Sequence, residues 1–246
     1  MRIEVFADYD QMSAAAAALV ERAVSAAERP VLGFATGATP IGLYRALVAR
    51  HRAGALSFSR ARSFNLDEYV GLPASHPQSY RSYMRENLFD AVDFAAGACR
   101  VPDGQADSLK AECEAYEAQI AAAGGIDLQV LGIGTNGHIG FNEPGTPFGT
   151  LTHVATLSER TRQSNAVYFA GVEAVPKRAI SMGIRTIMNA RRLVLLASGS
   201  SKAEAIRHTV SGPVTPEVPS SVLQLHPDLT LLLDRAAAAA LDGVSA

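Results

Sequence analysis

The sequence predicts an α/β protein with a doubly wound, mostly parallel sheet and helices on both faces, a Rossmann-like arrangement. Short apolar runs typical of buried strands alternate with segments whose apolar residues recur at helical spacing. The run at 193–196, Leu-Val-Leu-Leu, is continuous, as in a central parallel strand covered on both faces. Neither an internal repeat nor a low-complexity linker interrupts the 246 residues, so a single domain over 1–246 is expected.

The first half of the chain shows this alternation clearly. Apolar residues three and four apart predict helices, whereas a run such as Val31-Leu32-Gly33-Phe34 predicts a buried strand. Asp and Thr favour the position before a helix, and Pro its first position. The predicted elements are a helix capped by Asp10 and stopped at Arg29-Pro30, a strand at 31–34, a helix capped by Thr39 with Pro40 at its first position, a strand ending near 64–66 and a helix over 80–88.

The second half continues the pattern but contains one long connection. Segment 145–169 begins without clear periodicity, so we expect a mobile lid over a site. The predicted elements are a helix from Leu109 that ends at Gly124-Gly125, strands at 126–133, 193–196 and 229–233, a helix over 201–208 and an alanine-rich helix at the carboxyl terminus.

Composition and charge exclude several classes of function. The net charge of −2 leaves no basic footprint for nucleic acid or an anionic membrane. The longest apolar run, 14–20, is too short to span a bilayer, and the acidic amino terminus is unlike a signal peptide. Cys99 and Cys113 are expected to be reduced thiols. We therefore expect a cytoplasmic protein whose partner is a small molecule.

Four of the predicted strand ends carry unusual polar sequences. In an open parallel sheet, ligands bind beyond the carboxyl ends of the strands. We therefore expect these four segments to meet at one edge of the sheet and form a site there. The segments are 35–40, Ala-Thr-Gly-Ala-Thr-Pro; 65–69, Asn-Leu-Asp-Glu-Tyr; 136–144, Asn-Gly-His-Ile-Gly-Phe-Asn-Glu-Pro; and 198–202, Ser-Gly-Ser-Ser-Lys.

The turn at 36–39 has the features of an anion site. Small residues, hydroxyls and free backbone amides stand before a predicted helix, where the helix dipole favours negative charge, and a phosphate suits such a turn. The same residues are equally compatible with an ordinary strand-to-helix turn. Lys202 would add a cation to a phosphate bound there, although a single lysine is more often a solvated surface residue.

Asp67 and His138 are the candidate proton-transfer groups. Asp67 follows a strand predicted to be buried, and burial raises the pKa of a carboxyl so that it can act as a general base. Taken alone, Asp67 is also compatible with a helix cap or a surface turn, and His138 with a structural histidine. Glu143, five residues after His138, favours a catalytic role for His138, because a carboxylate orients an imidazole and raises its basicity.

Two other kinds of site are not expected. Residues 132–137, Gly-Ile-Gly-Thr-Asn-Gly, fit the dinucleotide fingerprint, but Gly140 and Pro144 interrupt the helix that the fingerprint requires, so no nicotinamide cofactor is predicted. A metal site is not predicted either, because His138 has no second histidine or cysteine at ligand spacing.

The chain resembles the glucosamine-6-phosphate deaminases, of the glucosamine/galactosamine-6-phosphate isomerase family, over essentially its whole length. The stretches around Asp67 and His138 are long and specific, which makes the resemblance strong. The matching residues are Thr36-Gly37-Ala38-Thr39-Pro40, 64–72, 131–147, Thr161-Arg162 with Asn165, 181–184 and 199–202.

The resemblance implies a reaction and assigns roles. Glucosamine 6-phosphate and water would give fructose 6-phosphate and ammonia, with no cofactor. His138 would move the proton that opens the pyranose ring, oriented by Glu143 and by Asn136. Asp67 would move a proton between carbons 2 and 1 of the open chain. The residues that match phosphate-binding positions are Thr36, Gly37, Ala38, Thr39, Arg162 and Lys202.

The chain departs from the family pattern at two places. Many members have an aspartate where this chain has Asn136, and an amide cannot stabilise an imidazolium by charge. Allosteric hexameric members carry basic residues after the glutamate loop and a longer carboxyl-terminal tail. Residues 149–155 contain no Lys or Arg, and the chain stops at Ala246. We therefore expect no activation by the N-acetylated sugar phosphate, and a monomer or small homo-oligomer.

Two other functions match parts of the sequence. The 6-phosphogluconolactonases look similar in fold and in the Gly-His loop, but their loop typically continues Thr-Ala-Ser-Leu-Phe-Pro and lacks the glutamate that this chain has at Glu143. A non-catalytic sugar-phosphate sensor would need only the phosphate-binding residues. Because Asp67, His138 and Glu143 are all present, an enzyme is expected.

Overall fold

The strands of the central sheet are parallel, so their carboxyl ends meet at one edge, as the sequence predicts. The structure is a computed structural model that describes residues 1–241, and within them the central sheet has seven strands, all paired in parallel. The order is β1 (Arg2–Phe6), β10 (Leu229–Asp234), β9 (Leu193–Ala197), β6 (Leu128–Leu131), β2 (Val31–Phe34), β3 (Arg62–Asn65) and β5 (Cys99–Arg100). From β2 the chain adds β3 and β5 on one side and then places β6 on the other side of β2, so the predicted doubly wound fold is confirmed.

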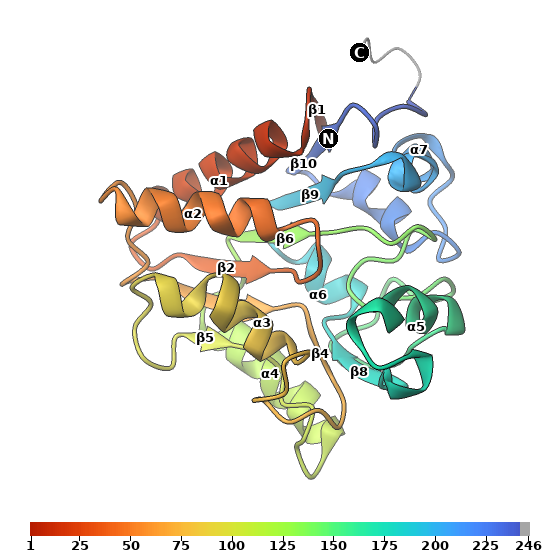
Figure 1. Ribbon diagram of the computed structural model, residues 1–246, viewed down its shortest axis with the longest axis horizontal. Coiled ribbons are helices and arrows are strands. Elements are labelled where there is room, and N and C mark those ends of the chain that lie inside the picture. The colour runs from red at the N-terminus through yellow and green to blue at the C-terminus, as the bar shows by residue number, and fades with distance from the viewer. Residues whose placement is uncertain (242–246) are drawn as a thin grey trace.

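Helices cover both faces of this sheet. Figure 1 shows α1 and α2 lying along one face, where their apolar stripes pack with the strands. Alternate residues of β9 serve the two faces: Val194 and Leu196 belong to the core under α1 and α2, and Leu195 to the opposite core. The helices of the first core are α1 (Tyr9–Ala26), α2 (Ile41–Arg52) and α3 (Tyr80–Asn87), followed by the short η1 (Phe89–Ala91).

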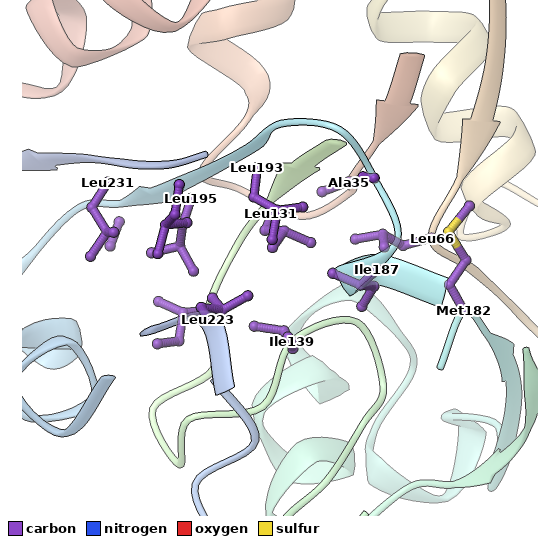
Figure 2. Close-up of a cluster of buried hydrophobic side chains, with 14 of the residues drawn as sticks. Ala35, Leu66, Leu131, Ile139, Met182, Ile187, Leu193, Leu195, Leu223 and Leu231 are labelled. Atoms are coloured by element: carbon purple, nitrogen blue, oxygen red, sulfur yellow. The ribbon is translucent and has the colours of Figure 1, made fainter. Parts of the chain in front are cut away.

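The opposite core reaches into the loops that carry the candidate site. Figure 2 shows the side chain of Ile139 among those of Leu131, Ile187 and Leu223. Because Ile139 is fully buried, it fixes the loop that bears His138 to the core. The elements that cover this face are α4 (Leu109–Ala122), α6 (Ile184–Met188), α7 (Ala203–Ser211) with η4 (Ser200–Lys202) before it, and η5 (Pro219–Leu225).

A second, antiparallel sheet lies beside the first, and the sequence analysis did not predict it. Its strands are only three or four residues long, too short to show a clear alternation. The segment predicted as a lid, 145–169, contains β7, so its centre is paired with β8 rather than irregular throughout. The elements are β4 (Asp67–Tyr69), β8 (Arg178–Ser181) and β7 (His153–Thr156), with α5 (Glu159–Asn165), η2 (Ala166–Tyr168) and η3 (Val172–Ala174) between β7 and β8.

The predicted cap of the first helix was wrong by two residues. Asp8, not Asp10, caps α1, and its side chain accepts a hydrogen bond from the amide of Gln11 at 2.8 Å. Asp10 already lies in the first turn, where its negative charge still suits the helix dipole.

The start of α2 also differs from the prediction. The helix begins at Ile41, and Pro40 occupies the cap position without any side-chain cap from Thr39. The reason lies on another helix, because the Tyr9 hydroxyl accepts a hydrogen bond from the amide of Gly42 at 2.7 Å. This tyrosine satisfies an amide that a capping side chain would otherwise bind.

The predicted end of α4 is confirmed, whereas the predicted helix near the carboxyl terminus is not. Gly124 and Gly125 end α4 with positive φ angles of 91° and 83°, as expected. Residues 235–240 form turns instead of the predicted alanine-rich helix, because a run this short gains too few helical hydrogen bonds to offset nucleation. The remainder of that prediction lies outside the described residues. No helix within residues 1–241 is long and apolar enough to cross a membrane.

Candidate functional site

A cavity of about 370 Å³ lies at the carboxyl ends of β2 and β6, within the size range of small-molecule sites. Figure 1 shows the arrowheads of β2, β6 and β9 pointing toward the side of the molecule where α5 lies. All four polar segments predicted to meet contribute to the lining. The predicted site residues that line the cavity are Thr36, Gly37, Ala38, Thr39, Asp67, Asn136, His138 and Lys202.

The two other predicted residues do not line it. Glu143 lies behind His138, with its Oε2 atom 3.9 Å from Nδ1 of the imidazole. Arg162 points elsewhere, because its guanidinium donates to the carbonyl of Val172 at 2.8 Å and lies 3.6 Å from the Glu173 carboxylate. In this structure Arg162 therefore holds the turn after α5, and a different arginine, Arg160, lines the cavity.

Tyrosines from three helices brace the turn at 36–39. The hydroxyl of Tyr44 donates to the carbonyl of Ala35, that of Tyr83 to Gly37 at 2.6 Å, and that of Tyr9 to Thr39 at 2.9 Å. These bonds turn the carbonyl groups toward the protein. Among the hydrogen bonds of residues 1–241, none uses the amides of residues 37–39 as donors. The turn therefore presents free N–H groups beside the cavity, as an anion site requires.

Lys202 lines the same cavity as this turn. Its Nζ atom donates to the carbonyl of Ile133 at 2.8 Å, which holds the ammonium at the end of β6. Burial lowers the pKa of Lys202 because the charged form loses hydration. An anion in the cavity would favour the charged form again.

Asp67 is the first residue of β4; it is buried and lines the cavity. Its Oδ1 atom accepts no hydrogen bond from the described residues. Burial, with a smaller contribution from the neighbouring Glu68 carboxylate, raises the pKa of Asp67 to about 8. Such a carboxyl can both take up and release a proton near neutral pH.

Glu68 points the other way, as expected for adjacent residues of a strand. Its carboxylate accepts hydrogen bonds at the start of α3, from the Ser79 hydroxyl at 2.8 Å and from the amides of Tyr80 and Arg81 at 2.9 and 3.0 Å. Glu68 thus anchors α3, which in turn brings Tyr80 to the cavity.

Two glycines of the loop after β6 make room for neighbouring side chains, His138 among them. A Cβ atom on Gly134 would lie 2.2 Å from Cε1 of His138, and one on Gly140 would lie 3.0 Å from Oγ of Ser181. Gly140 also has a φ of 56°, which favours glycine. No helix follows β6 in the described chain before β7, so residues 132–137 lack the helix that a dinucleotide fingerprint requires.

His138 is held in a nearly enclosed position with an unsatisfied nitrogen. Its Nδ1 atom is buried and forms no hydrogen bond among the described residues. Burial lowers the pKa of His138; the Glu143 carboxylate opposes this, while Lys202 and Arg160 add to it. The imidazole is therefore mainly neutral at neutral pH and able to accept a proton.

Asn136 supports Glu143 more directly than it supports the imidazole. Its Nδ2 atom donates to Glu143 Oε2 at 2.9 Å, and its Oδ1 atom accepts from the backbone amide of His138 at 3.2 Å. From the sequence we expected Asn136 to orient the ring of His138 by hydrogen bonding. Instead, the Asn136 side chain bonds to the backbone amide of His138 and to the Glu143 carboxylate, and the ring nitrogen Nδ1 faces Glu143.

The first turn of α5 completes the site. The family resemblance includes Thr161, Arg162 and Asn165, but the contacts of Ser158 and Thr161 with Glu143 were not predicted. The hydroxyls of Ser158 and Thr161 donate to Glu143 Oε1, the first at 3.0 Å. Burial alone would raise the pKa of Glu143, but the hydrogen bond from Thr161, the charge of His138 and the bonds from Asn136 and Ser158 outweigh it and lower that pKa. Besides the family resemblance at Thr161, the sequence signal for this turn is the cap-forming Ser158, fifteen residues beyond Glu143.

The comparisons with known proteins agree with this geometry. A profile described as glucosamine-6-phosphate isomerases/6-phosphogluconolactonase matches residues 7–231. A glucosamine-6-phosphate deaminase from Shouchella clausii is 52% identical over 231 residues, 94% of each chain. A solved structure of a monomeric glucosamine-6-phosphate deaminase superposes with a TM-score of 0.96 at 46% identity, covering 98% of this chain and 100% of that one.

A more distant structure shares the fold alone. The 6-phosphogluconolactonase from Trypanosoma brucei superposes with a TM-score of 0.78 at 22% identity, over 98% of both chains. Both the profile and the relatives cover nearly the whole of this sequence. The chain belongs to the glucosamine-6-phosphate isomerase/6-phosphogluconolactonase family.

Proposed function

We propose that this protein catalyses the conversion of glucosamine 6-phosphate and water to fructose 6-phosphate and ammonia. The observation that carries the proposal is the meeting of three groups at one cavity: the braced turn at 36–39, the buried carboxyl of Asp67, and the His138–Glu143 pair. Relatives about half identical to this chain bear the name of that activity. The cavity supplies an anion site, a separate base and a proton carrier, which this reaction needs.

Binding begins with the phosphate. The free amides of residues 37–39 and the hydroxyls of Thr36 and Thr39 face a dianion, and Lys202 supplies a positive charge. The sequence resemblance also assigns Arg162 to the phosphate. Because its guanidinium is engaged with Val172 and Glu173, that role would require α5 to rearrange.

His138 then opens the pyranose ring. The imidazole takes the proton from the hydroxyl on carbon 1 and returns it to the ring oxygen as the bond between carbon 1 and that oxygen breaks. The depressed pKa of His138 keeps it neutral and ready for the first transfer. Glu143 stabilises the imidazolium formed between the two transfers.

Asp67 carries out the isomerisation. Its carboxylate removes the proton from carbon 2 of the open-chain aldehyde, the electron pair forms a carbon 1–carbon 2 double bond, and oxygen 1 gains a proton to give an enolamine. The Asp67 carboxyl then returns the proton to carbon 1, leaving an iminium on carbon 2. Water adds to that carbon and ammonia leaves, so fructose 6-phosphate results. A pKa of about 8 suits both steps.

We also propose that segment 145–169 acts as a lid. Its helix α5 brings Arg160, Thr161, Ser164 and Asn165 to the cavity, so any movement of α5 alters access to the site. The proposed single domain fits a central sheet with a hydrophobic core on each face. The proposed cytoplasmic location fits two free cysteines, Cys99 and Cys113.

The protein is further proposed to be a monomer or small oligomer, independent of nucleic acid and without allosteric activation. The absence of Lys and Arg from residues 149–155 and the likeness to a deaminase described as monomeric support this. Rates should follow a hyperbola in glucosamine 6-phosphate, unchanged by the N-acetylated sugar phosphate. A sigmoidal curve that becomes hyperbolic when the acetylated sugar phosphate is added would contradict this proposal.

An ammonia-release assay tests the proposed function. The purified protein is incubated with glucosamine 6-phosphate and, separately, with 6-phosphogluconolactone. Ammonia and fructose 6-phosphate should form in equal amounts from the first, and the lactone should hydrolyse no faster than without protein. Binding of the amino-sugar phosphate without ammonia release would instead identify a sensor, and catalysed lactone hydrolysis a lactonase.

A further inference from the structure

Among residues 1–241, Arg160 is the one charged residue of the cavity lining to which neither the sequence nor the proposed reaction assigns a role. It lies in the first turn of α5, and its Nη2 atom donates to the hydroxyl of Thr135 at 2.9 Å. Among residues 1–241 no carboxylate forms an ion pair with Arg160. The guanidinium therefore keeps donors available for a ligand.

Its position relative to Lys202 indicates which ligand. Ile133 and Thr135 belong to the same short segment after β6. Arg160 donates a hydrogen bond to the hydroxyl of Thr135, and Lys202 donates one to the carbonyl of Ile133. Both cations also line the cavity that contains the turn at 36–39. The two positive charges and the free amides of that turn therefore line one cavity.

Two cations balance the charge of a sugar phosphate better than one does. A phosphate monoester carries a charge of about −1.5 to −2 at pH 7. Lys202 supplies a single charge, and its burial already disfavours that charge. A guanidinium adds a second charge and two parallel donors, the geometry preferred for phosphate oxygens.

We propose that Arg160 binds the substrate phosphate together with Lys202, and that Arg162, two residues later, anchors α5 instead. This inference rests on the proposed function for the identity of the substrate. When the phosphate is bound, Arg160 exchanges its contact with Thr135 for phosphate oxygens. Ser158 and Thr161, which hold Glu143, lie in the same turn as Arg160. Phosphate binding thereby fixes the turn that supports the His138–Glu143 pair.

Binding measurements on Arg160→Gln, Arg160→Lys and Arg162→Gln test the proposal without depending on turnover. The ligand is fructose 6-phosphate, measured by calorimetry, with inorganic phosphate as a second ligand. Arg160→Gln should weaken fructose 6-phosphate binding about tenfold to a hundredfold, the range for one lost charge-assisted contact, and Arg160→Lys should weaken it less. Binding by Arg160→Gln should also depend less steeply on salt concentration.

The comparison between the two arginines decides the assignment. Arg162→Gln should lower thermal stability and reduce affinity less than Arg160→Gln does. Arg207→Gln is the matched control, because it removes the same charge from α7 and Arg207 does not line the cavity. Unchanged affinity in Arg160→Gln, or a larger loss in Arg162→Gln, overturns the proposal.

The kinetic readout separates this inference from the proposed function. With glucosamine 6-phosphate, Arg160→Gln should raise KM by a similar factor, and its acid pH limit should move to higher pH, because Arg160 lowers the pKa of His138. A wild-type protein that releases no ammonia refutes the proposed function alone. The role of Arg160 is then still decided by the affinities for fructose 6-phosphate.

Discussion

Nδ1 of His138 lies 3.9 Å from Oε2 of Glu143, too far for a hydrogen bond, although both side chains are mostly buried. Glu143 is meanwhile fixed by Asn136, Ser158 and Thr161. The carboxylate therefore acts on the imidazole through its charge, which raises the pKa of His138 against the effect of burial. In an occupied site a small movement of either side chain would close the remaining gap.

Replacing Glu143 by Gln should change the pH profile as well as the rate. Without the carboxylate the pKa of His138 falls further, so the acid limb of the kcat/KM profile should move to lower pH. The imidazolium formed during ring opening loses its counter-charge, so kcat should fall about tenfold to a hundredfold. Glu159→Gln, at the exposed start of α5, is the matched control and should shift neither quantity. An unmoved acid limb in Glu143→Gln contradicts the electrostatic role.

Replacing Asp67 by Asn should remove the base without changing the shape of the site. We expect kcat to fall at least about a hundredfold, as is usual when a general base is lost. The measurement is ammonia release at saturating glucosamine 6-phosphate. Near-normal turnover by the variant would exclude Asp67 from the isomerisation step.

The same substitution should stabilise the protein in a pH-dependent way. The folded-state pKa of Asp67, about 8, lies above the unfolded value, so its protonated form is favoured in the folded protein. Its contribution to stability is fully present below about pH 4 and is lost as pH rises to about 8. Asp67→Asn should therefore unfold at a higher temperature than wild type at pH 8, with a smaller difference at pH 5. Equal differences at both pH values would argue against a raised pKa.

The sequence predicted the parts of the site that lie at strand ends and missed the parts contributed by tertiary packing. Residues at the ends of β2, β6 and β9 could be located because a parallel sheet brings such ends together. Arg160 could not, because nothing local distinguishes it from Arg162; only the direction of each side chain from α5 separates them. Likewise, Tyr9 caps α2 from another helix, a contact invisible to local pattern.

Removing the Tyr9 hydroxyl should weaken substrate binding more than catalysis. In Tyr9→Phe the amide of Gly42 and the carbonyl of Thr39 lose their partner, and the turn at 36–39 loses one of its three braces. We expect KM for glucosamine 6-phosphate to rise about threefold to tenfold with little change in kcat, consistent with about 1 kcal/mol per lost hydrogen bond. Tyr83→Phe, which frees the carbonyl of Gly37, should behave alike. A fall in kcat at constant KM would contradict the brace.

Glu117 on α4 should prove essential for holding the start of β7. Its Oε1 atom accepts hydrogen bonds from the amide of Thr152 at 2.9 Å and from the hydroxyls of Thr152 and Thr186. Glu117 therefore links α4 and α6 to Thr152. This residue stands directly before β7, the strand of the small sheet that leads to α5. In Glu117→Ala these donors lose their shared acceptor, so we expect about 2–4 kcal/mol less stability in urea unfolding.

A local effect should accompany that loss, because β7 leads directly into α5. Hydrogen exchange in Glu117→Ala should speed up over residues 152–165 more than in the central strands, and kcat should fall through poorer support of Glu143. Glu117→Gln retains a carbonyl acceptor and should recover most of both properties. Wild-type stability in Glu117→Ala would show that solvent replaces the carboxylate at little cost. Uniformly faster exchange across the whole chain would point instead to a global destabilisation with no specific link to α5.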